Sequence, residues 1–154
     1  MSEYHNTRAQ EILATIRYAT IATVTPDGKP WNSPVAHEID ADNIIYWFSD
    51  KANQHSVNVR ENPHAYIVIY DSTVPEGDGE GVYIEVDVTE LDNADEINAI
   101  RNTKKGKVVD DASEFLGDAV RRCYKAVPKR MWMNDAEVED GKFIRDYRVE
   151  VNFD

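Results

Sequence analysis

Short runs of β-branched and aromatic residues, separated by tight-turn sequences, constrain the fold of this chain more than any other feature. The run at residues 21–25 is followed by Pro-Asp-Gly-Lys at 26–29, and the next run, 31–39, leads through a polar turn into residues 44–49. Apolar runs bounded by Pro, Gly, Asp and Asn are typical of consecutive antiparallel strands. We therefore expect a β meander or barrel.

Four further strand-like runs lie later in the chain, at residues 65–70, 81–88, 129–134 and 142–151. Residues 81–88 alternate apolar and acidic side chains, which predicts one wet face and one buried face. The last two runs flank an Asp140-Gly141 turn that is typical of a hairpin. About six strands with a few inserted helices predict a mostly β protein, a six-stranded antiparallel barrel.

Helical periodicity is limited to a few segments. Apolar residues at helical spacing predict an amphipathic helix over about residues 3–18. A short helix is expected to end before Pro63, because proline cannot continue it. Two more helices are expected, one capped by Asn93 or Asp95 and one over residues 111–125.

The length of 154 residues fits one domain that can bury a core without disulfide or metal staples. No internal repeat, low-complexity linker or shift in composition marks a second domain. We expect a single domain over residues 1–154, with the barrel spanning about 20–152.

The charge balance excludes several partner classes. The chain has 17 Lys and Arg against 29 Asp and Glu, a net charge of −12, which repels phosphate backbones and anionic lipid. Its apolar runs are far shorter than the ~20 residues needed to cross a bilayer. Its single cysteine, Cys123, cannot form an internal disulfide, and the N-terminus lacks the pattern of a secretory signal. Nucleic acid and membranes are therefore not expected as partners, and a cytoplasmic location is expected.

Familiar catalytic signatures are missing, so no catalytic residue is assigned. The sequence has no phosphate-binding Gly-x-x-x-x-Gly-Lys, no dinucleotide-type glycine turn, no His-Glu-x-x-His and no nucleophile elbow. The four histidines are scattered singly, so no metal site is expected. His5 and His64 are expected at the surface, and Cys123 is expected to be a buried hydrophobe.

Polar residues gather where the aromatic run at 44–49 gives way to the helix before Pro63. If Asn53 is the N-cap, the next three residues form a first turn whose free N–H groups and dipole bind anions. Lys51 would add a cation, and His55 a donor whose charged form a phosphate favours. Ordinary capping and an ordinary surface lysine would explain the same residues. The candidate phosphate ligands are Ser49, Lys51, Asn53, Gln54 and His55.

The preceding strand carries a proline at position 34. A proline within a strand removes a ladder donor and leaves backbone groups free to meet a ligand. A flat heteroaromatic ring could then lie against Trp47 and Phe48, while Ser33 meets its polar edge. Alternatively, Pro34 marks an edge strand and the two aromatic residues belong to the core.

Taken in order, these segments resemble the pyridoxamine 5'-phosphate oxidase-like family of flavin-binding split barrels over nearly the whole chain. Residues 21–30 resemble the family's first hairpin, 33–35 its second strand and 45–49 its third. Residues 53–63 resemble its helix, which begins with a phosphate-binding Ser/Gln-Lys or Ser/Gln-His element and ends in Asn-Pro. None of these motifs is specific alone, but their order and spacing match.

The resemblance implies a six-stranded split barrel that forms a homodimer, with one FMN in each of two clefts at the subunit interface. The residues that would line or lie near the isoalloxazine are Ser33, Pro34, Val35, Trp47 and Phe48. The phosphate would lie among the candidate ligands named above. Arg130 and Trp132 would reach the flavin from the partner subunit, or Trp132 would only pack the dimer.

The resemblance also implies an FMN-dependent oxidoreductase acting on an unidentified small molecule, because in such enzymes the cofactor carries the electron chemistry. The alternatives are a flavin-binding or stress-related module without turnover, a deazaflavin-dependent relative, and an interaction dimer without cofactor. Reduction of bound flavin by NADH or NADPH would separate an enzyme from a module. His55 stands where many members have a lysine, and the acidic loop at 76–80 disfavours a polyanionic second ligand.

Overall fold

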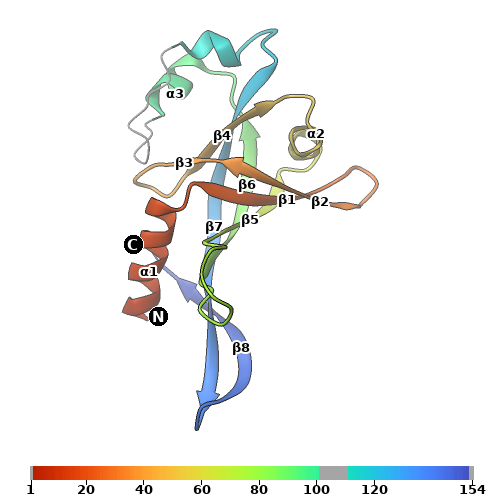
Figure 1. The fold of residues 1–154 in the computed structure, drawn as a ribbon. Helices are drawn as coiled ribbons and strands as arrows, with labels where there is room; N and C mark the ends of the chain where they lie inside the picture. Colours follow the sequence, from red (N-terminus) through yellow and green to blue (C-terminus); the bar gives the residue numbers. More distant parts are fainter. Residues whose placement is uncertain (1, 101–110, 153–154) are drawn as a thin grey trace.

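The computed structural model describes residues 2–100 and 111–152, which form one large sheet with helices at its ends and faces (Figure 1). The helices are α1 (Glu3–Thr15), α2 (Gln54–Glu61) and α3 (Ala94–Ala99), with a 3-10 turn, η1, at Ala112–Phe115. The strands are β1 (Tyr18–Val24), β2 (Pro30–Ala36), β3 (Glu38–Ile39), β4 (Ile45–Asp50), β5 (His64–Tyr70), β6 (Gly81–Glu90), β7 (Arg121–Glu139) and β8 (Lys142–Val151).

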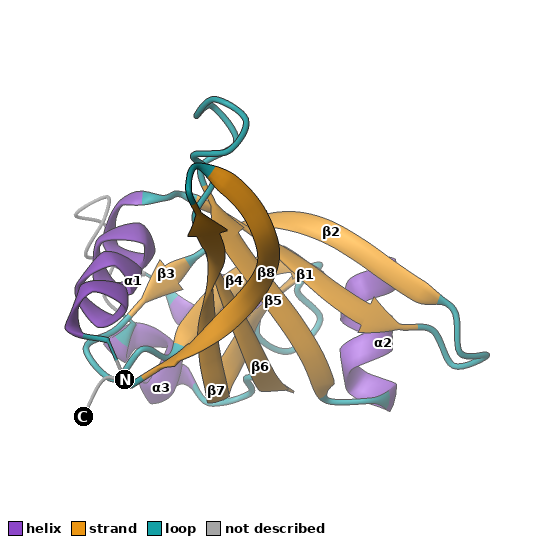
Figure 2. Ribbon diagram, turned by 90° about the horizontal axis from the view of Figure 1, so that it is seen from below, coloured by secondary structure: helices purple, strands orange, loops and turns teal. Residues whose placement is uncertain are grey.

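The sheet is antiparallel and its strands run in the order β2-β1-β5-β6-β7-β4-β3, with β8 also paired to β7. It does not close, as in a split barrel. The strand β7 serves two partners in succession: its first part pairs with β4 and its second part with β8, while β6 runs along its other side. Figure 2 shows β8 and α2 on well-separated parts of the sheet.

Alternating burial divides the sheet into an inner and an outer face. On β1, Ala19 and Ile21 are fully buried, while Tyr18 and Ala22 on either side of them are exposed. The inner side chains form the main core together with α1 and Trp47 of β4. A second core cluster includes Tyr46, Ile97, Phe115 and Cys123, under α3 and η1. Cys123 is thus a buried hydrophobe, as predicted, and burial raises the pKa of its thiol to about 12.

The predicted turns form with the expected geometry. Asp140 and Gly141 have φ of 49° and 76°, the left-handed pair that matches the twist of a two-residue hairpin. In the turn after β1, the Thr25 N–H donates to the Lys29 carbonyl, and Gly28 takes a φ of 84°. Both hairpins are therefore specified locally.

The predicted helix over residues 111–125 is wrong. Only Ala112–Phe115 turns helically, and Gly117, with a φ of 59°, precedes an extended chain from Arg121 onward. Of the apolar residues expected on one helix face, Phe115 lies in η1 and Cys123 in β7, and the others lie in the segment between these elements. Pairing of β7 with both β4 and β6 overrides the local helical spacing, because a central strand gains two ladders of hydrogen bonds.

Two other expectations need correction. The sheet has eight strands rather than about six, because residues 31–39 divide at His37 into β2 and β3 and every other strand-like run forms a strand of its own. His5 is buried, at 8% exposure, because its Nε2 lies 3.0 Å from an oxygen of Asp135. His64 is exposed, as predicted. Within residues 2–100 and 111–152, no helix has the length and apolarity to cross a bilayer.

Candidate functional site

The loop from β4 into α2 holds the predicted phosphate ligands. The strand β4 ends at Asp50, and α2 begins after Asn53, which is the N-cap residue as predicted. His55 in the first turn is buried, and its Nε2 lies 3.0 Å from Ser49 Oγ at the end of β4. The structure therefore brings Ser49 and His55 together, at the point where the helix N-terminus starts.

A network of short hydrogen bonds fixes α2 on the sheet. The Ser56 hydroxyl donates to the Asp50 carbonyl at 2.8 Å, and Asn58 Nδ2 donates to Thr23 Oγ1 at 2.9 Å. Gln54 Nε2 donates to Asn58 Oδ1 at 2.7 Å. Ser56 and Asn58 are completely buried, so their polar groups need these partners. The first turn of α2 is consequently held in one position.

Backbone donors of this first turn are available to an anion. The first intrahelical bond of α2 runs from the Val57 N–H to the Asn53 carbonyl, and the Asn53 side chain makes no capping hydrogen bond. The N–H groups of Gln54, His55 and Ser56 come before this bond and therefore have no acceptor within the helix. Together with the helix dipole, these donors fit a phosphate group.

Lys51 is the nearest cation to this turn in the sequence. Its Nζ lies 3.5 Å from the Asp118 carbonyl, a weak contact at the surface. Its backbone is held more firmly, because its N–H donates to Val120 and its carbonyl accepts from Arg60 Nη2 at 2.6 Å. The lysine side chain can therefore turn toward an anion while the loop stays in place.

Arg60 is a positioning residue that the sequence did not single out. Besides the Lys51 carbonyl, its guanidinium contacts Glu90 Oε1 at 3.2 Å and the Tyr124 hydroxyl at 3.3 Å. The Tyr124 hydroxyl also donates to Glu90 at 2.9 Å, and burial raises the pKa of this tyrosine to about 12. The only sequence signal was a basic residue in the last turn of the helix.

The strand residues predicted to line a ring do not share one surface. Ser33 and Val35 lie opposite Ile21 and Ala19 and so face the inner side, whereas Pro34 faces outward on the edge strand β2. Pro34 therefore marks an edge strand, the simpler of the two interpretations. The three residues remain close to the sheet edge, but only Pro34 lies on its outer face.

The aromatic residues of β4 belong to the two cores. Trp47 is 1% exposed and stacks on Tyr124, with 5.8 Å between ring centroids and 17° between planes. Phe48 faces the other side of β4 and packs on Phe115 at 4.4 Å. The structure thus favours the core interpretation of both residues over contact with a ring.

Arg130 and Trp132 form part of a second cluster, on the outer face of β7. The Arg130 guanidinium lies 4.8 Å from the Trp132 ring and pairs with both oxygens of Glu150, at 2.9 and 3.0 Å. Trp132 lies nearly parallel to Tyr66 of β5, with 6.3 Å between centroids. We call the set Tyr66, Tyr83, Arg130, Trp132 and Arg148 the aromatic-arginine cluster.

The other members of the aromatic-arginine cluster were not predicted from the sequence. Arg148 Nη1 donates to the Tyr66 hydroxyl at 2.8 Å, and its guanidinium lies 4.1 Å from the ring of Tyr83. These residues come from β5, β6 and β8, far apart in the chain. Only their outward positions in alternating strands could have indicated them, and the pairing of the strands was needed to bring them together.

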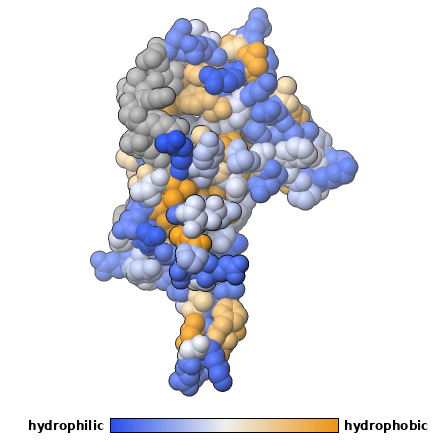
Figure 3. All heavy atoms as spheres, in the orientation of Figure 1, coloured by the Kyte–Doolittle hydropathy of each residue, from blue (hydrophilic) through white to orange (hydrophobic). Residues whose placement is uncertain are grey.

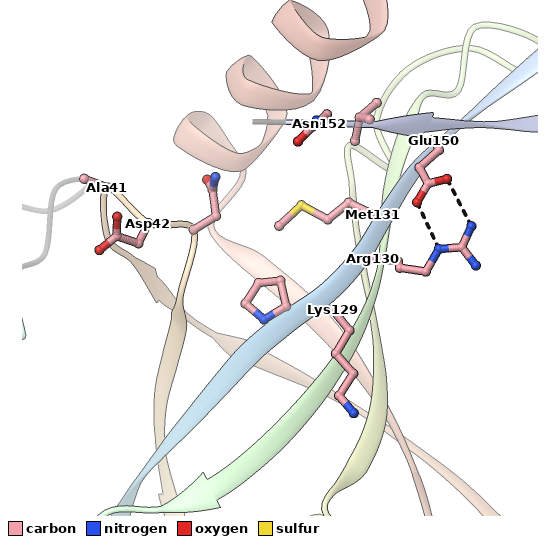
Figure 4. A pocket seen from close by; sticks show the side chains of 10 residues that line it. Ala41, Asp42, Lys129, Arg130, Met131, Glu150 and Asn152 are labelled. Carbon is pink, nitrogen blue, oxygen red and sulfur yellow. Dashed lines mark hydrogen bonds and ion pairs between the residues drawn. The ribbon is translucent and has the colours of Figure 1, made fainter. Parts of the chain in front are cut away.

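A hollow of about 630 Å³ opens beside this cluster, between the turn at residues 41–43 and the end of β8 (Figure 4). It lies where β7 has finished pairing with β4 and has not yet begun pairing with β8. Met131 points across it, and Arg130 turns away to meet Glu150. Lys129 is the extra residue of a β-bulge opposite β6, and its Nζ bonds Asp87 at 2.7 Å. Hydrogen bonds from Lys129 and His64 hold the pKa of Asp87 below its usual value.

Acid should weaken the fold through His55. Burial lowers the pKa of His55 from its ordinary 6.5. The unfolded chain therefore takes up a proton at a higher pH than the folded chain, and the free energy of unfolding falls as the pH drops below the ordinary histidine pKa of about 6.5. We expect His55→Gln to flatten this slope in urea titrations, while the exposed control His64→Gln keeps it. Equal slopes in wild type and His55→Gln would contradict the assignment.

The sheet is open and antiparallel, and α2 starts at the end of the inner strand β4 and presents free backbone donors. This combination defines the split-barrel class. A family model described as pyridoxamine 5'-phosphate oxidase matches residues 6–133. The chain belongs to this family, which confirms the resemblance seen in the sequence. No curated protein sequence matches it significantly.

Similar solved structures share the fold at low sequence identity. General Stress Protein 26 from Bacillus anthracis is 16% identical with a TM-score of 0.60, covering 91% of this chain and 97% of that one. The heme storage protein HutZ from Vibrio cholerae is 14% identical with a TM-score of 0.66, covering 81% and 91%. A structure named F420 reductase is 19% identical with a TM-score of 0.57, covering 79% and 94%.

Proposed function

We propose that this protein is an FMN-dependent oxidoreductase that acts on a small molecule as a homodimer. The observation that carries the proposal is the start of α2, where backbone donors meet a buried Ser49–His55 pair and Lys51 lies three residues before Gln54. This donor set fits a phosphate monoester, which needs several N–H donors and positive charge. The membership of the chain in the pyridoxamine 5'-phosphate oxidase family supports the same cofactor.

Each part of FMN has residues that would hold it. The phosphate would lie at the N–H groups of residues 54–56, beside Lys51 and His55. The ring would lie along the sheet edge near Pro34, and Arg130 with Trp132 of the second subunit would cover it. When bound, FMN supplies the electron transfer, so the chain's own residues orient it and exclude water. The chain is acidic, so the positive charge of Lys51 matters for attracting an anion to this turn, while His55, whose pKa is lowered by burial, offers a hydrogen-bonding group.

The test is the visible absorption of the purified protein. We expect a yellow protein that releases FMN on heating and takes it up again stoichiometrically. A colourless protein that does not bind added FMN would overturn the proposal. Heme and F420, the ligands named for structural relatives, serve as competitors in the same titration. Stronger binding of either would replace FMN as the cofactor.

Turnover is a separate question, because the same pocket could serve a flavin-binding module. The similarity to General Stress Protein 26 favours this second candidate, a stress-related module. Anaerobic mixing of the FMN-loaded protein with NADH or NADPH distinguishes them. Loss of flavin absorbance within the mixing time of an assay indicates an oxidoreductase. No reduction by either nucleotide, together with tight FMN binding, indicates the module.

A further inference from the structure

We propose that Arg60 gives the candidate site its selectivity for a flavin that carries a phosphate group. It does so by fixing the loop at residues 51–53, between β4 and α2, and not by touching the flavin itself. The inference rests on the FMN binding of the proposed function, and it adds a residue that decides which flavin is bound.

A bond from the end of α2 back to the loop before it carries the inference. Arg60 lies in the last turn of α2, and its Nη2 donates to the Lys51 carbonyl at 2.6 Å. So short a distance is typical of a hydrogen bond from a charged donor. The Lys51 N–H donates to the Val120 carbonyl at 2.9 Å, and the Asn53 N–H donates to the Asp50 carbonyl at 3.1 Å. The position of Lys51 therefore depends on the far end of the helix that its loop precedes.

Arg60 is itself held by the central strands of the sheet. Its Nη1 contacts Glu90 Oε1 at 3.2 Å and the Tyr124 hydroxyl at 3.3 Å. Glu90 and Tyr124 pair across the β6–β7 ladder, and Tyr124 is fully buried and stacks on Trp47. Burial raises the pKa of Tyr124 to about 12, so its hydroxyl keeps its proton and donates to Glu90 at 2.9 Å. A residue of the core thus sets the place of the guanidinium group.

A guanidinium group suits this task better than another cation. Its planar fork donates to three acceptors at once, the Lys51 carbonyl, the Glu90 carboxylate and the Tyr124 hydroxyl. A lysine ammonium at the same position has the charge but not the fork. Because these donors are already committed, Arg60 acts on a bound phosphate through the loop and is not itself a ligand.

The geometry of the loop matters because the site lies at a polar surface. Figure 3 shows mainly hydrophilic side chains on the side of the molecule where α2 lies. Water and salt weaken a single charge at such a surface, so an anion is held only where several donors converge on it. Lys51 begins the loop that Arg60 fixes, and the free N–H groups of residues 54–56 follow the loop directly. A displaced loop separates the lysine from the helix turn, and the loss falls on the phosphate.

The test compares FMN with riboflavin, which differs from it only in lacking the phosphate. Quenching of flavin fluorescence gives the dissociation constant of the full chain for each. We expect Arg60→Met, which keeps an unbranched stem, to weaken FMN binding about 10-fold, the effect of one lost charge-assisted hydrogen bond. Riboflavin binding should change less than about twofold, because a ring near Pro34 on β2 does not use the bonds of Arg60.

Two further variants separate positioning from charge and from general damage. Arg60→Lys keeps the charge, and we expect it to bind FMN as weakly as Arg60→Met does. Wild-type affinity in Arg60→Lys would show that charge alone matters and would overturn the inference. The matched control is Arg8→Met on α1, which removes an arginine of similar exposure, 40% against 36%, that also pairs with a glutamate. It should leave the affinity for both flavins unchanged.

Amide hydrogen exchange without flavin gives a second readout. Exchange at residues 51–56 should be faster in Arg60→Met than in wild type, whereas α1 should keep its wild-type rates. Equal losses for FMN and riboflavin, or no loss for either, overturn the inference. A wild type that binds both flavins equally removes only this inference. A wild type that binds neither removes the proposed function together with the selectivity, and the exchange rates alone then decide whether Arg60 fixes the loop.

Discussion

Trp47→Ala should lower the free energy of unfolding by about 3–5 kcal/mol, the range for removing a large buried aromatic side chain. Trp47 is 1% exposed in the main core and loses its stacking on Tyr124 when it is truncated. The neighbouring elements α1 and β7 are fixed by their own ladders and contacts, so the cavity cannot fully collapse. Urea unfolding at equilibrium, followed by circular dichroism, measures the change.

Two tryptophan variants serve as controls for this prediction. Trp31→Ala on the edge strand β2, where the side chain is 45% exposed, should cost less than about 1 kcal/mol. Trp47→Phe should cost about 1–2 kcal/mol, because the buried Trp47 Nε1 has no hydrogen-bond partner in the described part of the chain. A Trp47→Ala protein as stable as Trp31→Ala would show that Trp47 is not a core residue.

The double variant Lys51→Ala with His55→Ala should weaken FMN binding about 100-fold. Each substitution removes one charge-assisted contact to the phosphate, worth about 1.4 kcal/mol, or a factor of ten in affinity. Quenching of flavin fluorescence during titration gives the dissociation constant. The expected loss appears in binding, since neither side chain is assigned a role in electron transfer.

The matched control is Lys29→Ala with His64→Ala, which removes the same residue types from exposed positions outside the candidate site. It should bind FMN as wild type does. Circular dichroism of both double variants establishes that α2 is still folded, because His55 also contacts Ser49. Unchanged affinity in the folded Lys51 and His55 variant would place the phosphate elsewhere.

Local signals predicted the parts of the fold that short segments specify. The hairpin turns at Gly28 and Asp140-Gly141 and the start of α2 at Asn53 all depend on a few neighbouring residues. Their backbone preferences do not need tertiary contacts to decide them. The sequence therefore located the start of α2, where Ser49 and His55 meet.

Features decided by distant partners could not be predicted. The segment from Arg121 carries helix-like spacing, and only its pairing with β4 and β6 makes it a strand. His5 resembled a surface residue until Asp135, from the other end of the chain, covered it. Tyr66 and Arg148 meet for the same reason. A single sequence shows none of these pairings, since periodicity describes an element but not its neighbour.

The position of β7 has a consequence for biosynthesis. β4 lies between β3 and β7 in the sheet, so its longer ladder, the one with β7, can form only after residues 121–126 have been synthesised. Until that segment leaves the ribosome, Trp47 has no Tyr124 to stack on and β6 has an open edge. These strand edges therefore stay unpaired until β7 has been synthesised, and unpaired strands are prone to misassociation. We expect nascent chains that end before β7 to need a chaperone, and chains that include it to fold in one cooperative step.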